Sequence, residues 1–215
     1  GFLPGKNFLR RASTPLEKRY FGNALIFTEE EKKRLLKQKQ YPLAVQITAP
    51  LFRQVRDADD VAKMQYIDLH TWMVGDILVK ADKMTMANSL ELRVPFLDHH
   101  VFEFAAAIPL QYKIRGGLTK YVLRQAFADV VPPAAVKRPK RGFPVPTRVW
   151  LRGPMAREVA DVLNDPALGR YFNRSYMRKL LADHRDGQAD NSRKIWTLVI
   201  LTLWMQKFHQ QNGGL

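Results

Sequence analysis

The chain has 215 residues, of which 46% are hydrophobic and 11% aromatic, so it can bury a core and general disorder is excluded. Its 35 Lys and Arg against 20 Asp and Glu give a formal charge of +15, which predicts an anionic partner, a missing acidic part of the same protein, or both. Cysteine is absent, which excludes disulfides, thiolate metal sites and cysteine nucleophiles and suits a cytoplasmic location.

The first part of the chain predicts two helices. Thr28 lies three residues before Glu31, the spacing of a capping box, so a short helix is expected to begin directly after Thr28. Asp57 is the predicted cap of a long helix over residues 58–88, because apolar residues recur at helical spacing and no proline interrupts them. We expect this long helix to bend at Gly75.

The middle of the chain predicts turns that position charged residues. The stretch ELRVPFLD (91–98) is expected to be extended or turn-like, since Pro95 disfavours helix at the residue before it. A compact helix follows it and ends at Pro109. The stretch KIRGGLTKYVLRQAF then predicts a Gly-Gly turn, a cap at Thr119 and a helix with Lys120 in its first turn.

The last third predicts helices over residues 155–163, 175–184 and 192–209, the last of them apolar on most of its circumference and therefore central. Its most apolar part, 195–205, is shorter than the roughly 20 residues of a membrane span, so no membrane association is expected. Helix dominates and no β-α-β alternation is visible, so the fold class is predicted to be mainly α.

Two groups of charged residues are candidates for a site. Asp76, Lys80 and Lys83 follow helical spacing along one face, as either a solvated ion-pair stripe or a partly buried, paired acid among apolar neighbours. Lys120, at the start of a helix, and Lys140, in the loop KRPKRGFPVP (137–146), are a candidate phosphate-binding pair. The five histidines show no metal-ligand spacing, so no metal held by this chain is predicted.

Several motifs in order resemble one family. GDILVKADKMTMANSLELRVPFLDHHVFEFAAAIP, then KIRGGLTKYVLRQAF, then RPKRGFPVP and WLRG closely resemble the C-terminal part of glutamine-hydrolysing asparagine synthetases, and LPGKNFLRR with RYFGNALIF resembles bacterial members. The resemblance implies that residues 1–215 are the helical C-terminal portion of a synthetase domain whose α/β fold is like that of the adenine-nucleotide α-hydrolases, or PP-loop ATP pyrophosphatases.

The resemblance also implies a reaction that uses ATP and Mg²⁺. The side-chain carboxylate of aspartate attacks the α-phosphate of ATP, giving an aspartyl adenylate and pyrophosphate, and ammonia from glutamine then displaces AMP. Negative charge gathers around phosphorus in such a step, which calls for preplaced cations. By the family's motifs, Lys140 stabilises the phosphoryl transition state and Lys120 contacts the nucleotide phosphates.

Other site residues follow from the same motifs. Asp76 matches a carboxylate that acts as proton acceptor in the second half-reaction, with Lys80 and Lys83 expected to keep it ionised. Glu91, Arg93 and Asp98 match the family's LE-R-PFLD signature, and for them we expect a structural ion-pair role that locks the long helix against the next one, in preference to direct catalysis.

The chain also lacks parts that the family has. It contains neither the N-terminal glutaminase with its leading cysteine, nor the SGGxDS pyrophosphate loop, nor the acidic segment that holds Mg²⁺. We therefore expect a fragment whose partners are the missing portions of the same protein, with metal ligands outside this chain, and expect the chain alone to make no AMP from ATP and aspartate. The resemblance leaves a homodimer of the full enzyme open.

Two alternatives remain at this point. An amidotransferase of the same family could act on another carboxylate, such as a surface-polymer sugar acid, a peptide or a β-lactam-type substrate. A basic helical module that binds nucleic acid belongs to a different class. The sequence argues against the second, because its basic residues are spread along the chain and show no helix-turn-helix or RNP signature.

Overall fold

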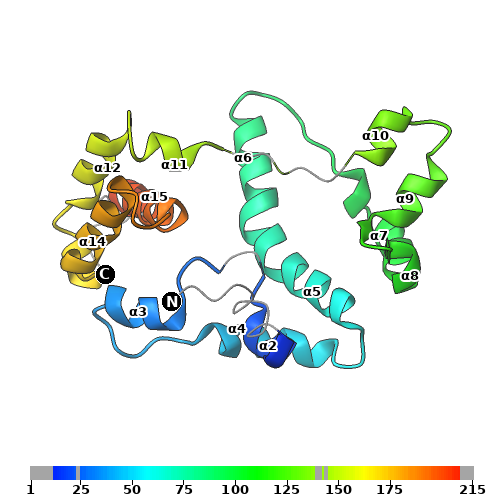
Figure 1. Cartoon of the computed structure of the whole chain (residues 1–215), viewed down its shortest axis with the longest axis horizontal. Helices are drawn as coiled ribbons and strands as arrows, with labels where there is room; N and C mark the ends of the chain where they lie inside the picture. Colours follow the sequence, from blue (N-terminus) through cyan, green and yellow to red (C-terminus); the bar gives the residue numbers. More distant parts are fainter. Residues whose placement is uncertain (1–11, 23–24, 139–141, 143–144, 209–215) are drawn as a thin grey trace. The chain divides into compact units, whose positions relative to one another are not determined.

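The structure is a computed structural model that describes residues 12–22, 25–138, 142 and 145–208. The chain divides into two compact units: unit 1 lies within residues 1–24 and 45–142, and unit 2 within residues 25–44 and 143–215. Both are mostly helical in their described parts, as the sequence predicts (Figure 1). No helix in the described part of the chain combines the length and apolar character needed to cross a membrane.

Unit 1 contains short helices and one β-hairpin. In chain order its elements are α2 (Leu16–Arg19), α4 (Ala44–Gln54), α5 (Asp60–Asp68), the π-helix η1 (Leu69–Leu78), α6 (Val79–Met86), the 3-10 helix η2 (Pro95–Leu97), α7 (His99–Ala107), α8 (Leu110–Lys113), β1 (Ile114–Arg115), β2 (Leu118–Thr119), α9 (Tyr121–Ala126) and α10 (Pro133–Lys137).

The predicted long helix is present, but it differs from the prediction in two ways. It begins at Asp60 with Asp59 as its cap, whose carboxylate accepts the Ala62 N–H at 2.9 Å, so the prediction of Asp57 as the cap is wrong. Asp57 instead pairs with Arg56. The helix also widens from α5 into η1 before it returns to α-helical geometry in α6, a change that apolar periodicity does not signal.

The segment after α2 lies close to the long helix and is hydrogen-bonded to it. The Tyr20 hydroxyl donates to Asp68 Oδ2 at 2.6 Å, and burial, with this hydrogen bond and the charge of Asp68, raises the pKa of Tyr20. Gly22 follows with φ of +77°, and a Cβ atom there would lie 2.9 Å from Thr71 Oγ1. Glycine is therefore required at this crossing by both backbone conformation and space.

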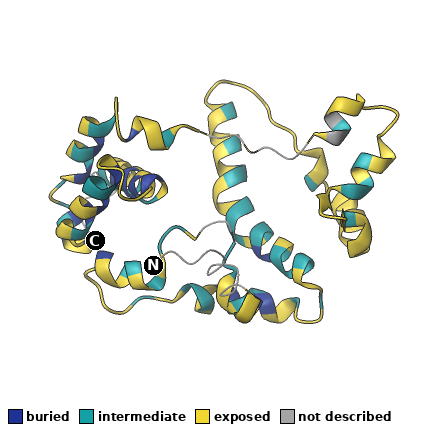
Figure 2. Ribbon diagram, viewed as in Figure 1, coloured by how far each residue is buried: buried dark blue, intermediate teal, exposed yellow. Residues whose placement is uncertain are grey.

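Unit 1 buries little apolar surface within itself. Its buried cluster consists of Leu16, Phe52 and Ile67. No residue of η1, α6, α7, α8 or α9 is buried, and Figure 2 shows these elements in the colours of exposed and intermediate residues. Large apolar side chains remain in solvent, at 74% exposure for Phe104 and 76% for Val130. Exposed apolar surface on this scale is typical of regions that bind another protein segment, a ligand or a membrane.

Unit 2 has a larger core. Its elements are α3 (Glu29–Leu35), α11 (Thr147–Trp150), α12 (Ala156–Leu163), α13 (Leu168–Tyr171), α14 (Arg174–Arg185) and α15 (Ser192–Phe208). The three helices predicted for the last third of the chain correspond to α12, α14 and α15, and Figure 2 shows buried residues gathered on them. The core residues are Leu35, Leu151, Val159, Leu163, Leu168, Phe172, Met177, Leu180, Ile195, Leu198 and Val199.

Polar contacts complete this core. Thr28 and Glu31 form the predicted capping box at the start of α3. His184 is buried, accepts the Asn191 N–H at Nδ1 over 3.3 Å, and lies with Nε2 3.2 Å from the Arg148 carbonyl oxygen. Both ring nitrogens are therefore satisfied, which agrees with a structural role for this histidine and ties α14 to α11.

The contact between Glu31 and Lys194 joins α3 to α15 and should make unit 2 sensitive to acid. Burial acts to raise the pKa of Glu31, but the hydrogen bond from Lys194, the Thr28 backbone N–H and the lysine charge together lower it. A lowered pKa means that this stabilisation is present above the unfolded value, about 4.3, and is lost as the pH falls through the folded value.

We predict that Glu31→Gln lowers the free energy of unfolding at pH 7 by about 1 to 2 kcal/mol, because it keeps the capping box but loses the charge-assisted bond. The difference from the parent chain should shrink in urea unfolding at pH 3. Glu30→Gln, which removes a more exposed pair with Lys33, is the control and should change stability by less than about 0.5 kcal/mol. Equal effects of the two substitutions would contradict the assignment.

Candidate active site

Asp76 lies on the π-helical segment η1, where a side chain of the preceding turn orients it. The Trp72 indole Nε1–H donates to Asp76 Oδ2 at 2.9 Å, and Lys80 Nζ lies 3.9 Å from Asp76 Oδ1. The carboxylate is about half exposed, at 55%. Stretches of π-helix in proteins occur frequently at functional sites, because the wider turn redirects side chains. One oxygen of Asp76 is thus hydrogen-bonded to Trp72, and about half of the side chain remains accessible to solvent.

The other predicted neighbours of Asp76 differ in their contacts. Lys80 reaches the carboxylate, whereas no acidic side chain in the described part of the chain lies within ion-pair distance of Lys83. The structure therefore brings one of the two predicted lysines to Asp76. Trp72 was not among the predicted site residues, although its spacing of four residues from Asp76 is a signal that could have found it.

Glu91, Arg93 and Asp98 lie in the turn between α6 and α7. Arg93 Nη2 is 2.9 Å from Glu91 Oε1, so the expected ion pair exists, but it spans two residues and both side chains are exposed. Asp98 caps α7 by accepting the backbone N–H groups of His100 and Val101 at 3.0 and 3.3 Å. These contacts fix the local turn, and a role in locking the two helices together stays a prediction.

Lys120 has a strained backbone. Gly116 and Gly117, with φ of +56° and +76°, form the two-residue turn of the β1–β2 hairpin that precedes it. Lys120 then takes the left-handed conformation, φ 58° and ψ 34°, and is itself the N-terminal cap residue of α9. The predicted cap at Thr119 is wrong, because Thr119 belongs to β2 and pairs with Ile114. A lysine in this conformation costs about 1 to 2 kcal/mol, which points to a functional reason for its backbone geometry.

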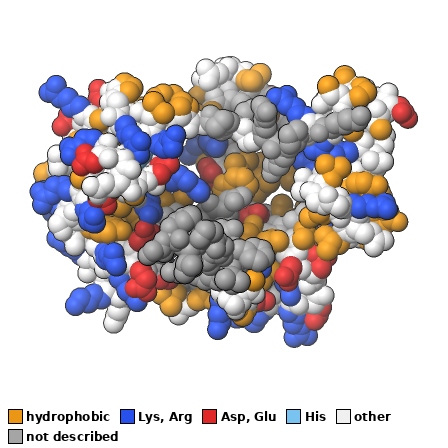
Figure 3. All heavy atoms as spheres, in the orientation of Figure 1, with side chains coloured by type: hydrophobic (Ala, Val, Ile, Leu, Met, Phe, Trp, Pro, Cys, Tyr) orange, Lys and Arg blue, Asp and Glu red, His pale blue; other side chains and the backbone are white. Residues whose placement is uncertain are grey.

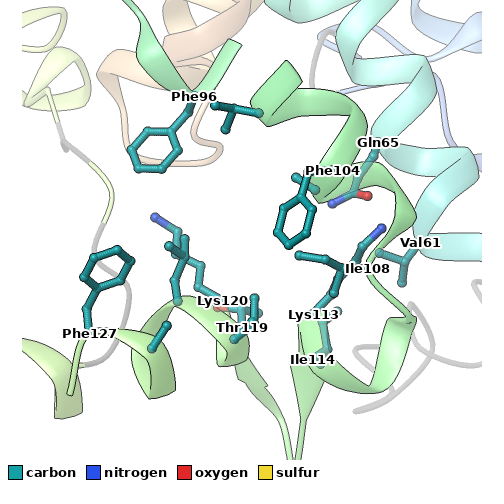
Figure 4. A pocket seen from close by; sticks show the side chains of 15 residues that line it. Val61, Gln65, Phe96, Phe104, Ile108, Lys113, Ile114, Thr119, Lys120 and Phe127 are labelled. Carbon is teal, nitrogen blue, oxygen red and sulfur yellow. The ribbon is translucent and has the colours of Figure 1, made fainter. Parts of the chain in front are cut away.

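A cavity of about 560 Å³ lies beside Lys120 within unit 1, a size suited to a small ligand (Figure 4). Its lining is mainly apolar and aromatic, with a few polar groups. It includes Val61, Gln65, Phe96, Val101, Phe104, Ala105, Ile108, Lys113, Ile114, Thr119, Lys120, Val122, Leu123, Ala126 and Phe127. Of these, only Lys120 was predicted as a site residue, because apolar periodicity cannot separate cavity lining from core. Asp76 does not belong to this described lining.

Lys140 lies outside the described residues, and its surroundings are therefore not part of the site built here. The described residues contain no group of three or more His, Cys, Asp or Glu side chains that could hold a metal ion. Figure 3 shows Lys and Arg side chains of the described residues at several separate places on the visible face. The spread gives no support to the nucleic-acid alternative.

Comparisons with known proteins identify the family. A family model described as asparagine synthase matches residues 3–206. The chain belongs to the asparagine synthase family. It is 50% identical over 203 residues to the glutamine-hydrolyzing asparagine synthetase 1 of Bacillus subtilis, a match that covers 94% of this chain and 32% of the relative. It is 45% identical over 204 residues to the putative glutamine-hydrolyzing asparagine synthetase of Mycobacterium tuberculosis, covering 94% of this chain and 31% of the relative.

More distant asparagine synthetases match a shorter part of the chain. The enzyme of Gallus gallus is 32% identical over 136 residues, which covers 55% of this chain and 24% of that protein. The chain thus spans about a third of the length of the bacterial relatives that it matches over most of its own length. No solved structure matched the chain.

The strain at Lys120 can be measured by comparing two substitutions. We predict that Lys120→Gly is more stable than Lys120→Ala by about 1 kcal/mol, because glycine adopts the left-handed conformation without the Cβ clash. Urea unfolding gives both values. Lys63, inside α5, is the control site, where the alanine variant should be the more stable by about 1 kcal/mol. An alanine variant at 120 as stable as the glycine variant would refute the strain.

Proposed function

We propose that this chain is the C-terminal, mainly helical part of the amide-forming domain of a glutamine-hydrolysing asparagine synthetase. The observation that carries the proposal is the asparagine synthase match over residues 3–206 in a chain that spans about a third of its relatives. The nucleotide-binding sheet, of the adenine-nucleotide α-hydrolase type, and the glutaminase domain would belong to the rest of the protein. The uncovered apolar side chains of unit 1 support such a missing neighbour.

In the proposed reaction, a side-chain carboxylate oxygen of aspartate attacks the α-phosphorus of ATP, and the bond to the bridging oxygen of pyrophosphate breaks. Ammonia from glutamine then attacks the acyl carbon of the aspartyl adenylate. The bond between this carbon and the phosphate oxygen breaks, AMP leaves with that oxygen and the bonding electrons, and the nitrogen loses a proton. The proposed location is the cytoplasm, which the absence of cysteine from the sequence suits.

Lys120 and Lys140 are proposed to stabilise the negative charge on the phosphates. Lys120 is supported by its strained backbone conformation beside a ligand-sized cavity, where its side chain could bind an anionic group. Mg²⁺ would neutralise further phosphate charge, and the described residues supply no carboxylate cluster for it. Its protein ligands are therefore proposed to lie elsewhere in the full enzyme.

Asp76 is proposed to accept the proton that nitrogen loses. The Trp72 N–H holds Oδ2, so the carboxylate has a defined orientation, while half of the side chain stays accessible to a reacting group. A general base needs both properties. Lys80 Nζ lies 3.9 Å from Oδ1, on the other side of the carboxylate from Trp72.

We predict that Lys140→Ala in the full-length enzyme lowers aspartate-dependent release of pyrophosphate from ATP by a factor on the order of 10² to 10³, because one transition-state cation is lost. Glutaminase activity, which uses another domain, should be unchanged. Arg138→Ala is the matched control from the same basic loop and should lose less than about tenfold.

An unchanged rate of pyrophosphate release in Lys140→Ala would contradict the role of this lysine. Clear formation of AMP from ATP and aspartate by the 215-residue chain alone would contradict its role as one part of a larger site. Replacing aspartate by other carboxylic acids in the same assay tests the substrate, since a faster acid would favour the alternative amidotransferase.

A further inference from the structure

Arg124 contacts the backbone of two separate segments of unit 1. It lies on α9, one turn after Lys120, and its backbone N–H donates to the Lys120 carbonyl at 3.1 Å. Its side-chain Nε–H donates to the Thr119 carbonyl at 3.0 Å. The two terminal nitrogens reach the other segment, where Nη1 donates to the carbonyl of Val136 and both nitrogens lie 3.2 Å from the carbonyl oxygen of Arg138.

The planar guanidinium is suited to this arrangement. Its N–H groups point outward in a fixed fork, so one half-buried side chain can bind carbonyls on both sides at once. A lysine ammonium is a single point and cannot reach the Thr119 carbonyl and the 136–138 segment together. The acceptors that the Arg124 guanidinium contacts are neutral backbone carbonyl groups, and no acidic side chain among the described residues forms an ion pair with it.

These contacts fix the backbone on both sides of the strained residue, Lys120. Lys120 keeps a left-handed backbone although it is not a glycine, and its own carbonyl and that of the residue before it are both bonded to Arg124. A strained conformation persists when the surrounding structure fixes it. The second segment, anchored by the same guanidinium, leads in the sequence to Lys140, two residues beyond Arg138.

We propose that Arg124 is a positioning residue of the amide-forming site, which acts by holding the backbone of Lys120 in its left-handed conformation against the 136–138 segment. The proposal rests on the proposed function, because it assigns Lys120 to phosphate binding. Arg124 itself need not touch the substrate. Its removal displaces the Lys120 ammonium, and a displacement of about 1 Å in such a site can cost on the order of 10²-fold in rate.

The first test compares Arg124→Lys and Arg124→Met in the full-length enzyme. Both should lower kcat for aspartate-dependent pyrophosphate release by a factor of about 10 to 100, with KM for aspartate changed less than about threefold and glutaminase activity retained. Arg115→Met is the control, since the Arg115 guanidinium contacts Tyr121 of the same helix by Nη1 at 3.2 Å. It should keep kcat within about threefold.

Two results of this comparison overturn the proposal. One is a parental kcat in Arg124→Met, and the other is full rescue by Arg124→Lys, which would show that a positive charge alone suffices. If Arg124→Met does not fold, Arg124→Lys carries the test by itself, because it preserves charge and length while it removes the fork.

The second test is a double-substitution cycle with Lys120→Gly, which removes the ammonium but fits the left-handed backbone. If Arg124 acts through Lys120, adding Arg124→Lys to Lys120→Gly should lower kcat by less than about threefold further. A purely structural role predicts that the two losses multiply, and that result overturns the proposal.

The same data separate this proposal from the proposed function. If the parent enzyme releases no pyrophosphate with aspartate, or if Lys120→Gly has the parental rate, the proposed function of Lys120 fails and the positioning role falls with it. If Lys120→Gly is impaired but its effect multiplies with that of Arg124→Lys, the positioning role alone fails.

Discussion

The structure of unit 1 depends on one constraint: its large apolar side chains need to be removed from water, and unit 1 buries few of them within itself. Its buried cluster holds three residues, whereas α6, α7 and α9 have no buried residue. Each large apolar side chain left in water forgoes about 1.5 to 3 kcal/mol of stabilisation. Unit 2 has a larger core of eleven buried residues, although α15 also exposes large apolar side chains such as Ile200 and Trp204. The difference is the physical argument for a protein segment that covers unit 1 in the full enzyme.

The candidate site lies in the unit with the smaller core, and local polar contacts give it its geometry. The Gly-Gly turn of the hairpin precedes Lys120, which adopts a left-handed conformation. The guanidinium of Arg124 binds the carbonyl of Thr119, directly before Lys120, and the carbonyl of Arg138 in the second segment. On the π-helix, Trp72 orients Asp76 in the same local way. These contacts are short-range in sequence or confined to a single helix and its neighbour, so they can exist before a covering segment is added.

Much of the fold could be predicted from the sequence because local physical rules determine it. The capping box of Thr28 and Glu31, helices α12, α14 and α15 and the Gly-Gly turn all follow from residue spacing and turn chemistry, whereas the two short strands and the short helices α11 and α13 were not predicted. The cap of α5 was misplaced by two residues because Asp57 and Asp59 are both good cap residues and spacing does not choose between them. The π-helix could not be predicted, since its hydrogen-bond shift leaves no apolar pattern.

The sequence supplied part of the candidate site, and the roles of its residues stay predictions. The resemblance to a family selected Lys120, Asp76 and Lys140, and the structure places the first beside a cavity and the second on a distorted helix. The contribution of Arg124 could not be read from the sequence, because its acceptors are backbone carbonyls separated by up to 19 positions, from Thr119 to Arg138. Every residue type has a backbone carbonyl, so a sequence motif cannot show which carbonyl accepts a hydrogen bond.

The central claim is that this chain completes a site in which aspartate is activated by adenylation. The most direct measurement supplies the full-length enzyme with aspartate labelled with ¹⁸O in its side-chain carboxylate, together with ATP and glutamine, and determines the mass of the AMP formed. The account predicts AMP that carries one ¹⁸O atom, because the attacking carboxylate oxygen stays on phosphorus when ammonia displaces AMP. Unlabelled AMP, or ADP and phosphate as the products, would contradict it.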